Sequence, residues 1–236
     1  MLALLIGAVL AVQPACSRDA SVRLDRAAAR AAAFDVKGAV AQLEAAADGP
    51  CEPVAVARVY GRGLLDANDA FLQGGSTESL APVRAAIAAL DALAAGRPGP
   101  ADIARLVLRA AAAAAQSERD EMRLYLDSAV QLESLQQAAG QSGAPLVSAA
   151  EIAGDLWLQL HRYDDARRAY ADAAGRLGST LRLLSGTARA ARRLMDATAA
   201  CGAYRRLLEA WGARAEVPEE IAEARVYAAG CSSPSR

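Results

Sequence analysis

The sequence predicts an all-α protein. Apolar residues make up 54% of the 236-residue chain, whereas aromatic residues make up only 4%. Alanine supplies much of the apolar excess, and it has the highest helix propensity of all residues. Two phenylalanines, few β-branched runs and no alternating apolar and polar segments leave little from which a sheet could form.

Glycine and proline divide the chain into short helical segments. Pro53, Pro100 and Pro218 stand where a first helical turn tolerates proline, and glycine-rich stretches mark the stops between segments. Because the connections are short, consecutive helices should run antiparallel, as five hairpins and one leftover helix. The predicted helices span 19–33, 36–47, 53–72, 79–95, 100–115, 118–139, 146–160, 163–177, 180–194, 197–211 and 218–229.

An interval of 34 residues recurs near the C-terminus. A shift of that length superimposes an alanine, a tyrosine and a glycine on residues of the same kind: Ala166 on Ala200, Tyr170 on Tyr204 and Gly178 on Gly212. Alanine coincidences are frequent in such an alanine-rich chain, so the tyrosine and glycine pairs carry the argument. An internal period of this size indicates stacked helical repeats.

Two segments resemble tetratricopeptide repeats. In residues 147–178 the matching positions are Ala153, Gly154, Trp157, Ala166, Tyr170 and Ala173. In residues 181–212 they are Leu184, Ala188, Ala191, Ala200, Tyr204 and Leu207. The resemblance implies antiparallel hairpins stacked as a right-handed superhelix, in which each hairpin covers the apolar face of the next, with a C-terminal capping helix. The chain would then consist of residues 1–15, the divergent hairpins of 16–145, and the two repeats and capping helix of 146–236.

The resemblance also implies a binding surface. In that family the first helix of each hairpin lines a concave groove that binds a peptide or a partner helix. Carried over to this chain, the groove residues are Glu151, Asp155, Leu158, Gln159, Arg182, Ser185, Arg189, Arg192 and Arg193.

The charge of this region suggests the kind of partner. Residues 162–206 contain ten arginines against four aspartates. Guanidinium groups bind carboxylates bidentately, so an arginine face suits a carboxylate or an acidic peptide. The alternative is a solvated face whose arginines pair with neighbours along the helix, as Asp164 and Arg168 could.

The first fifteen residues predict export. The run MLALLIGAVLAV carries no charge and is too short to span a bilayer, which is typical of a signal peptide. Cys16 follows a small alanine, so it is a candidate for lipidation, as in bacterial lipoproteins. The alternative is a buried N-terminal helix.

The four cysteines lie near the two ends of the chain. Cys16 and Cys51 flank the first predicted hairpin, and Cys201 and Cys231 flank the last helix pair. Each pair could close a disulfide, with the second worth about 3–4 kcal/mol in the chain-entropy model. Lipidation of Cys16 would exclude the first bridge, so these two interpretations compete. Free thiols in a cytosolic protein are the third possibility.

The residues offer little for catalysis. The single histidine, His161, falls in a turn far in sequence from every cysteine, and neither HExxH nor GxxxxGK occurs. We therefore expect no metal, no cofactor and no enzymatic activity. The net charge of −1 and the scarcity of exposed aromatic residues argue against nucleic acid as a partner.

The sequence thus favours a non-catalytic protein-interaction scaffold of the bacterial cell envelope, periplasmic or lipid-anchored. A cytosolic adaptor or regulatory module of the same fold, detached from an effector domain, is the alternative. An enzyme on a helical scaffold is a third class, for which no catalytic residues are evident.

Overall fold

The structure is a computed structural model that describes residues 16–45, 51–94, 98–141 and 143–231. All regular structure in these ranges is α-helical, which confirms the all-α prediction. The predicted signal segment 1–15 lies outside the described residues. The helices are α1 (Arg18–Ala32), α2 (Val36–Glu44), α3 (Glu52–Leu72), α4 (Ala81–Leu93), α5 (Pro100–Ala115), α6 (Arg119–Ala138), α7 (Ala149–Gln159), α8 (Tyr163–Leu177), α9 (Leu181–Arg193), α10 (Ala197–Trp211) and α11 (Glu219–Ala229).

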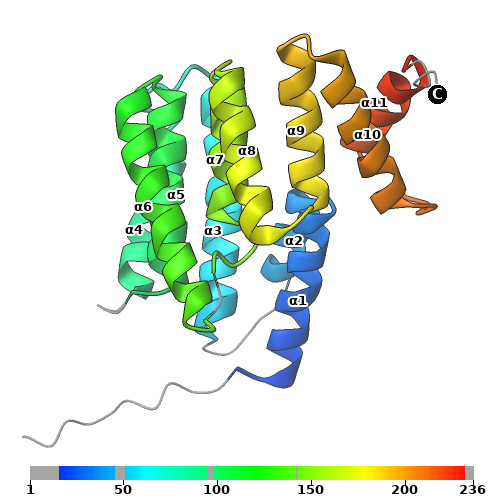
Figure 1. The fold of residues 1–236 in the computed structure, drawn as a ribbon. Coiled ribbons are helices and arrows are strands. Elements are labelled where there is room, and N and C mark those ends of the chain that lie inside the picture. The colour runs from blue at the N-terminus through cyan, green and yellow to red at the C-terminus, as the bar shows by residue number, and fades with distance from the viewer. Residues whose placement is uncertain (1–15, 46–50, 95–97, 142, 232–236) are drawn as a thin grey trace, which may run out of the picture.

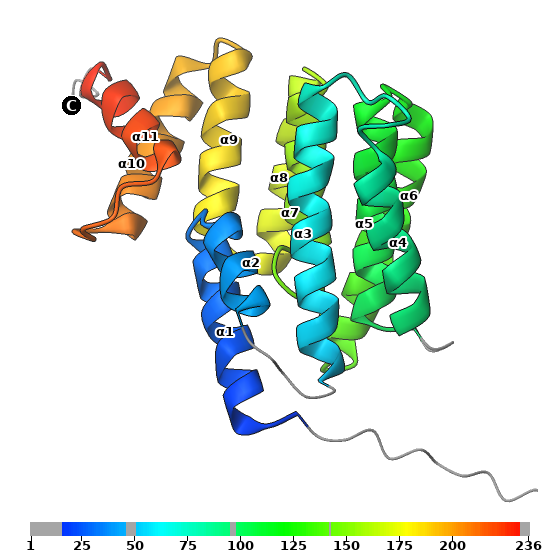
Figure 2. The ribbon, with the colours of Figure 1, turned by 180° about the vertical axis from the view of Figure 1, so that it is seen from behind.

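Helices that follow one another in the chain pack side by side. The pairs α1–α2, α5–α6, α7–α8 and α9–α10 form antiparallel hairpins, and α3 packs on both α4 and α5 (Figure 1). The largest apolar cluster extends from α1 to α7, and two smaller clusters lie toward α11. From behind, α1 and α2 lie beneath α9, so the first hairpin lies next to a helix that is far away in the sequence (Figure 2).

One tight turn recurs in four hairpins. In each turn a residue with positive φ follows the end of the first helix. The N–H of the next residue donates a hydrogen bond to a carbonyl in the last turn of that helix. The four residues are Phe34 (φ 71°), Ser117 (62°), His161 (57°) and Met195 (61°). Each is followed by a residue whose N–H donates to a carbonyl five positions earlier, as Arg162 does to Trp157 at 2.9 Å. This is the bonding of a Schellman helix ending, which satisfies carbonyls that the helix leaves open.

The turns preserve the 34-residue interval in the last two hairpins. His161 and Met195 share the turn conformation, and Gly178 and Gly212 both adopt positive φ (74° and 67°) where α8 and α10 end. Tyr170 and Tyr204 are both buried. The sequence period therefore corresponds to a recurring local geometry.

The Tyr170 ring explains why two neighbouring helices carry glycine. Its ring lies against Gly154 of α7 and Gly186 of α9, and a Cβ at either glycine would overlap ring atoms. The Tyr170 side chain is 1% exposed. The close approach of α8 to both helices therefore depends on the two missing side chains.

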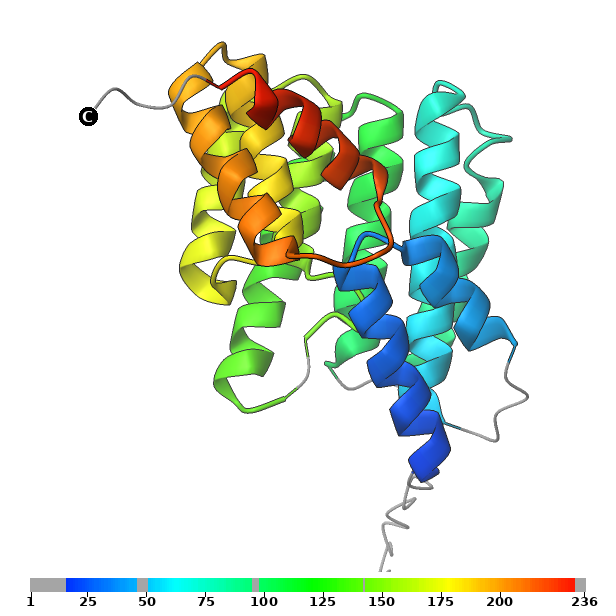
Figure 3. The same cartoon turned by 90° about the vertical axis from the view of Figure 1, so that its right-hand side faces the viewer.

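The tip of the first hairpin contacts the C-terminal helices. Phe34, in the turn between α1 and α2, packs against the cluster that contains Leu184 and Trp211, and its ring centroid lies 6.5 Å from that of Trp211. In the view of Figure 3, the first two helices and the last two helices all lie at the front of the molecule. This contact places a side chain from the start of the described chain beside α9.

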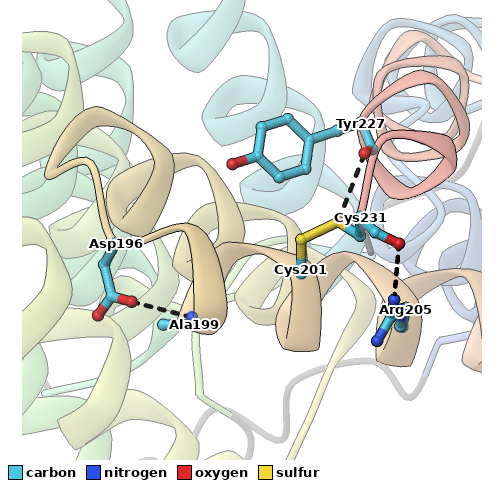
Figure 4. Close-up of a disulfide and its surroundings, with 6 residues drawn as sticks. All are labelled: Asp196, Ala199, Cys201, Arg205, Tyr227 and Cys231. Carbon is cyan, nitrogen blue, oxygen red and sulfur yellow. Dashed lines mark hydrogen bonds between the residues drawn. A yellow bond between two sulfur atoms is a disulfide. The ribbon is translucent and has the colours of Figure 1, made fainter. Parts of the chain in front are cut away.

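Two disulfides join the residues predicted as partners. Cys16 is bonded to Cys51, beside the first hairpin, and Cys201 of α10 is bonded to Cys231, just after α11. Arg205 also donates to the carbonyl of Cys231 at 3.1 Å, as Figure 4 shows. The structure thus contains the disulfide alternative for Cys16, in which its sulfur is not available to a lipid.

We predict that replacing glycine by alanine lowers stability where the glycine packs against Tyr170 and raises it at an open position of a helix. Gly154→Ala or Gly186→Ala should lower the free energy of unfolding by about 1–3 kcal/mol, because the new methyl group displaces the Tyr170 ring. Gly175→Ala is the control: it is within α8 and its Cβ would meet nothing within 4 Å. It should raise stability by up to about 1 kcal/mol through helix propensity. Urea denaturation measures all three, and equal effects would contradict the packing described.

Removing the second disulfide should loosen α11. In the Cys201→Ser, Cys231→Ser double variant we expect faster amide hydrogen exchange in α11, because that helix packs chiefly on α10 and buries only Ile221 and Ala224. Exchange in α3 and α5 should be unchanged. Uniformly faster exchange would mean that the disulfide stabilises the whole chain instead of one helix.

Candidate functional site

A groove of about 420 Å³ lies beside α9. Six parts of the chain contribute to its walls: the α1–α2 turn, α3, α7 with the following turn, the first residue of α8, α9, and α11. The lining residues are Phe34, Asn68, Phe71, Asp155, Leu158, Gln159, His161, Tyr163, Arg182, Ser185, Gly186, Arg189, Arg192, Arg193 and Glu220.

The structure brings together most of the residues that the sequence placed in the groove. Eight of those predicted residues line it, from Asp155, Leu158 and Gln159 on α7 to the arginines of α9. Glu151 does not line it: this side chain is buried between α7 and α9 and accepts a hydrogen bond from the Thr180 hydroxyl at 2.5 Å. Ser185 lines the groove but is itself buried.

Arg182 is held inside an ion-paired cluster. Its guanidinium donates to Asp155 at 2.7 Å and lies 3.9 Å from Glu151. Its side chain is only 16% exposed. Burial lowers the pKa of Arg182, but the charges of Asp155 and Glu151 outweigh burial and raise that pKa above its ordinary value. Arg182 therefore joins α9 to α7 and is not a free cation of the groove.

The two acids of this cluster differ in their surroundings. Asp155 accepts hydrogen bonds from both Arg182 and the Tyr170 hydroxyl, each at 2.7 Å. Burial raises the pKa of Glu151, against the lowering effects of its hydrogen bond from Thr180 and of the Arg182 charge. Burial also raises the pKa of Tyr170, and Asp155 raises it further. Asp155 is thus the principal partner of Arg182.

A second carboxylate neutralises the arginines at the other end of α9. Glu223 of α11 lies 2.7 Å from Arg192 and 3.7 Å from Arg189, and it accepts the hydroxyl of Tyr204 at 2.8 Å. Burial raises the pKa of Tyr204, and its hydrogen bond to Glu223 raises it further. The acidic group that the sequence led us to expect from a partner is therefore supplied in part by the chain itself.

Arg193 remains as an exposed cation on the groove wall. Within the described residues no hydrogen bond or ion pair joins its side chain to another residue. Arg189 and Arg192 share the carboxylate of Glu223. Together with Arg193, this end of the groove has three guanidinium groups, and one carboxylate is paired with them. Glu220 also lines the groove nearby.

Several lining residues were missed by the sequence analysis. Phe34, Asn68 and Phe71 come from the N-terminal part, where the repeat pattern is weak, and the sequence held no signal that they reach α9. Glu223 pairs with the groove arginines without lining the groove itself. It could have been found, because Asp155, Arg189 and Glu223 follow one another at the same 34-residue interval. Extending the shift to the last helix would have paired these charges.

The described residues contain no group of three or more histidine, cysteine, aspartate or glutamate side chains that could hold a metal ion. No described helix has the length and apolar composition of a membrane-spanning segment.

His161 lies in a turn beside Tyr163, with ring centroids 5.9 Å apart, and both line the groove.

Comparison with known proteins gives no relative: the chain matches no protein-family model, no curated protein and no solved structure.

We predict that the two acids around Arg182 contribute unequally. Asp155→Asn should lower the free energy of unfolding by about 2–4 kcal/mol, because it leaves a mostly buried guanidinium with only a distant carboxylate. Glu151→Gln should cost little or nothing at neutral pH, because the ionised carboxylate is disfavoured by burial and the amide oxygen still accepts from Thr180.

The pH dependence of Glu151→Gln gives a second readout. A carboxyl whose pKa is raised by folding contributes stability at low pH that is lost as the pH rises through the folded-state pKa. The stability of Glu151→Gln relative to the wild type should therefore increase with pH over that range. Urea denaturation from acidic to neutral pH measures it, and a relative stability that decreases with pH would contradict the assignment.

Proposed function

We propose that this chain is a non-catalytic interaction scaffold of the bacterial cell envelope, which holds a segment of a partner protein in the groove between α3, α7, α9 and α11. The observation that carries the proposal is the groove itself. Side chains from helices far apart in the sequence converge on it, and they combine aromatic, amide and guanidinium groups.

The recurring geometry supports a tetratricopeptide-like array for the last two hairpins. Tyr170 and Tyr204 are both buried, and their turn residues and terminal glycines share positive φ at an interval of 34 residues. α11 continues this pattern, since Glu223 follows Arg189 at the same interval. In such an array α11 would be the capping helix, and the first helices of the hairpins would line the binding face.

The cysteines support export. All four form two disulfides in the structure, and disulfides persist in oxidising compartments such as the periplasm. The uncharged apolar run before Cys16 agrees with a secretion signal. The bond between Cys16 and Cys51 favours a soluble periplasmic form over a form anchored by a lipid at Cys16.

The proposal predicts that one charge reversal in the groove abolishes partner capture. Arg193→Glu should reduce the retained partner by at least about tenfold, because it replaces an exposed cation by an anion where the partner docks. Wild-type and variant proteins would be immobilised, incubated with an envelope extract, and compared by quantitative mass spectrometry of what they retain.

Arg206→Glu is the matched control. It causes the same change in net charge at an exposed position on α10 that does not line the groove. Circular dichroism should show equal helicity for all three proteins. If Arg193→Glu and the wild type retain the same proteins in the same amounts, the groove is not the docking surface.

A further inference from the structure

Next to the groove lies a smaller apolar chamber of about 200 Å³. Its walls come from α3, α5 and α7 with the residue Val147 before it, and one side chain each comes from the start of α2 and from α9. The apolar lining residues are Val36, Leu64, Leu65, Ala67, Ala111, Val147, Ile152 and Leu156. For comparison, an apolar protein cavity of about 150 Å³ is large enough to bind benzene.

The chamber adjoins the groove along a shared polar border. Asn68, Asp155, Gln159 and Arg182 line both spaces. Asp155 and Arg182 are already paired with each other, which leaves the amides of Asn68 and Gln159 at this border. Side-chain amides can donate to and accept from a peptide backbone. The border therefore suits an uncharged peptide unit better than a charged group.

The guanidinium groups lie further along α9. Arg189 follows Arg182 by seven residues, or about 10 Å along the helix axis at 1.5 Å per residue. An extended peptide in the polyproline II conformation advances about 3.1 Å per residue with three residues per turn, so three residues cover this distance and bring the side chain back to the same face. A carboxylate at that position meets Arg189, Arg192 and Arg193. Among the described residues Arg189 and Arg192 share the carboxylate of Glu223 as their ion-pair partner, and Arg193 has none.

From this arrangement we infer that the partner segment is an extended peptide with a bulky apolar side chain in the chamber and an acidic residue three positions away at the arginines of α9. This inference rests on the proposed function and specifies the chemistry of its ligand. The buried apolar anchor supplies most of the affinity, as such anchors do at interfaces, and the acidic residue fixes the register.

Two synthetic peptides test the inference, because the geometry does not select a chain direction. They are fluorescein-labelled Gly-Leu-Gly-Ser-Glu-Gly and its reverse, Gly-Glu-Ser-Gly-Leu-Gly, both amidated at the C-terminus. Fluorescence anisotropy measures their dissociation constants with the full chain. We expect at least one to bind, with about tenfold or greater loss when its leucine is replaced by alanine.

Filling the chamber is the matching change in the protein. Ala111→Leu and Ala67→Leu add carbon to the chamber from two different helices. Because the added groups enter empty space, each variant should unfold at the same urea concentration as the wild type or a higher one. Each should weaken binding of the leucine peptide by at least tenfold. Using two variants protects the test against one that fails to fold.

The inference is overturned if neither peptide binds, or if replacing the peptide leucine or filling the chamber in folded variants leaves the dissociation constant unchanged. The proposed function has a separate test in partner capture by Arg193→Glu. Loss of capture with Arg193→Glu, together with unchanged capture by Ala111→Leu and Ala67→Leu, would keep the groove and reject the chamber.

Discussion

The Asp155 carboxylate is the interaction on which the C-terminal half of the molecule depends. It receives the Tyr170 hydroxyl from α8 and the Arg182 guanidinium from α9, so that one side chain of α7 joins three helices. The Tyr170 ring reaches it by passing between Gly154 and Gly186. These contacts depend on one another. The Tyr170 hydroxyl can reach Asp155 only because its ring packs closely against Gly154 and Gly186.

The same arrangement determines the chemistry of the groove. Arg182 is ion-paired with Asp155 and Glu151, and it holds α9 against α7. The exposed arginines of the groove therefore lie at the opposite end of α9. There Glu223 connects α11 to Arg189 and Arg192, while the disulfide between Cys201 and Cys231 ties the following residues to α10. The groove thus has a neutral, amide-lined part beside the apolar chamber and a cationic part beside α11. That polarity along one helix is what a peptide of defined register requires.

Local features of the sequence predicted much of this structure. Proline, glycine and apolar spacing located every described helix to within three residues at each end, and the cysteine positions indicated both bonded pairs. The period of 34 residues located α7 to α10 and, through them, eight residues of the groove. These successes share a cause: short connections make neighbours in sequence neighbours in space. Phe34 contacts Trp211, and Asn68 and Phe71 line the groove. These contacts join segments that are far apart in the sequence, and no local pattern encodes them. The pairing of the arginines was missed because a count of charges does not say which of them are buried together.

We propose that the groove is the surface that meets a partner. Site-specific photo-crosslinking in a Gram-negative host that expresses the chain with its N-terminal segment is the first experiment to make. A benzophenone side chain would replace Tyr163, which lines the groove, or Leu124, which is exposed on α6 away from it. We expect a discrete crosslinked species from position 163 and none from position 124. Crosslinking at position 124 with none at position 163 would show that the partner binds another face.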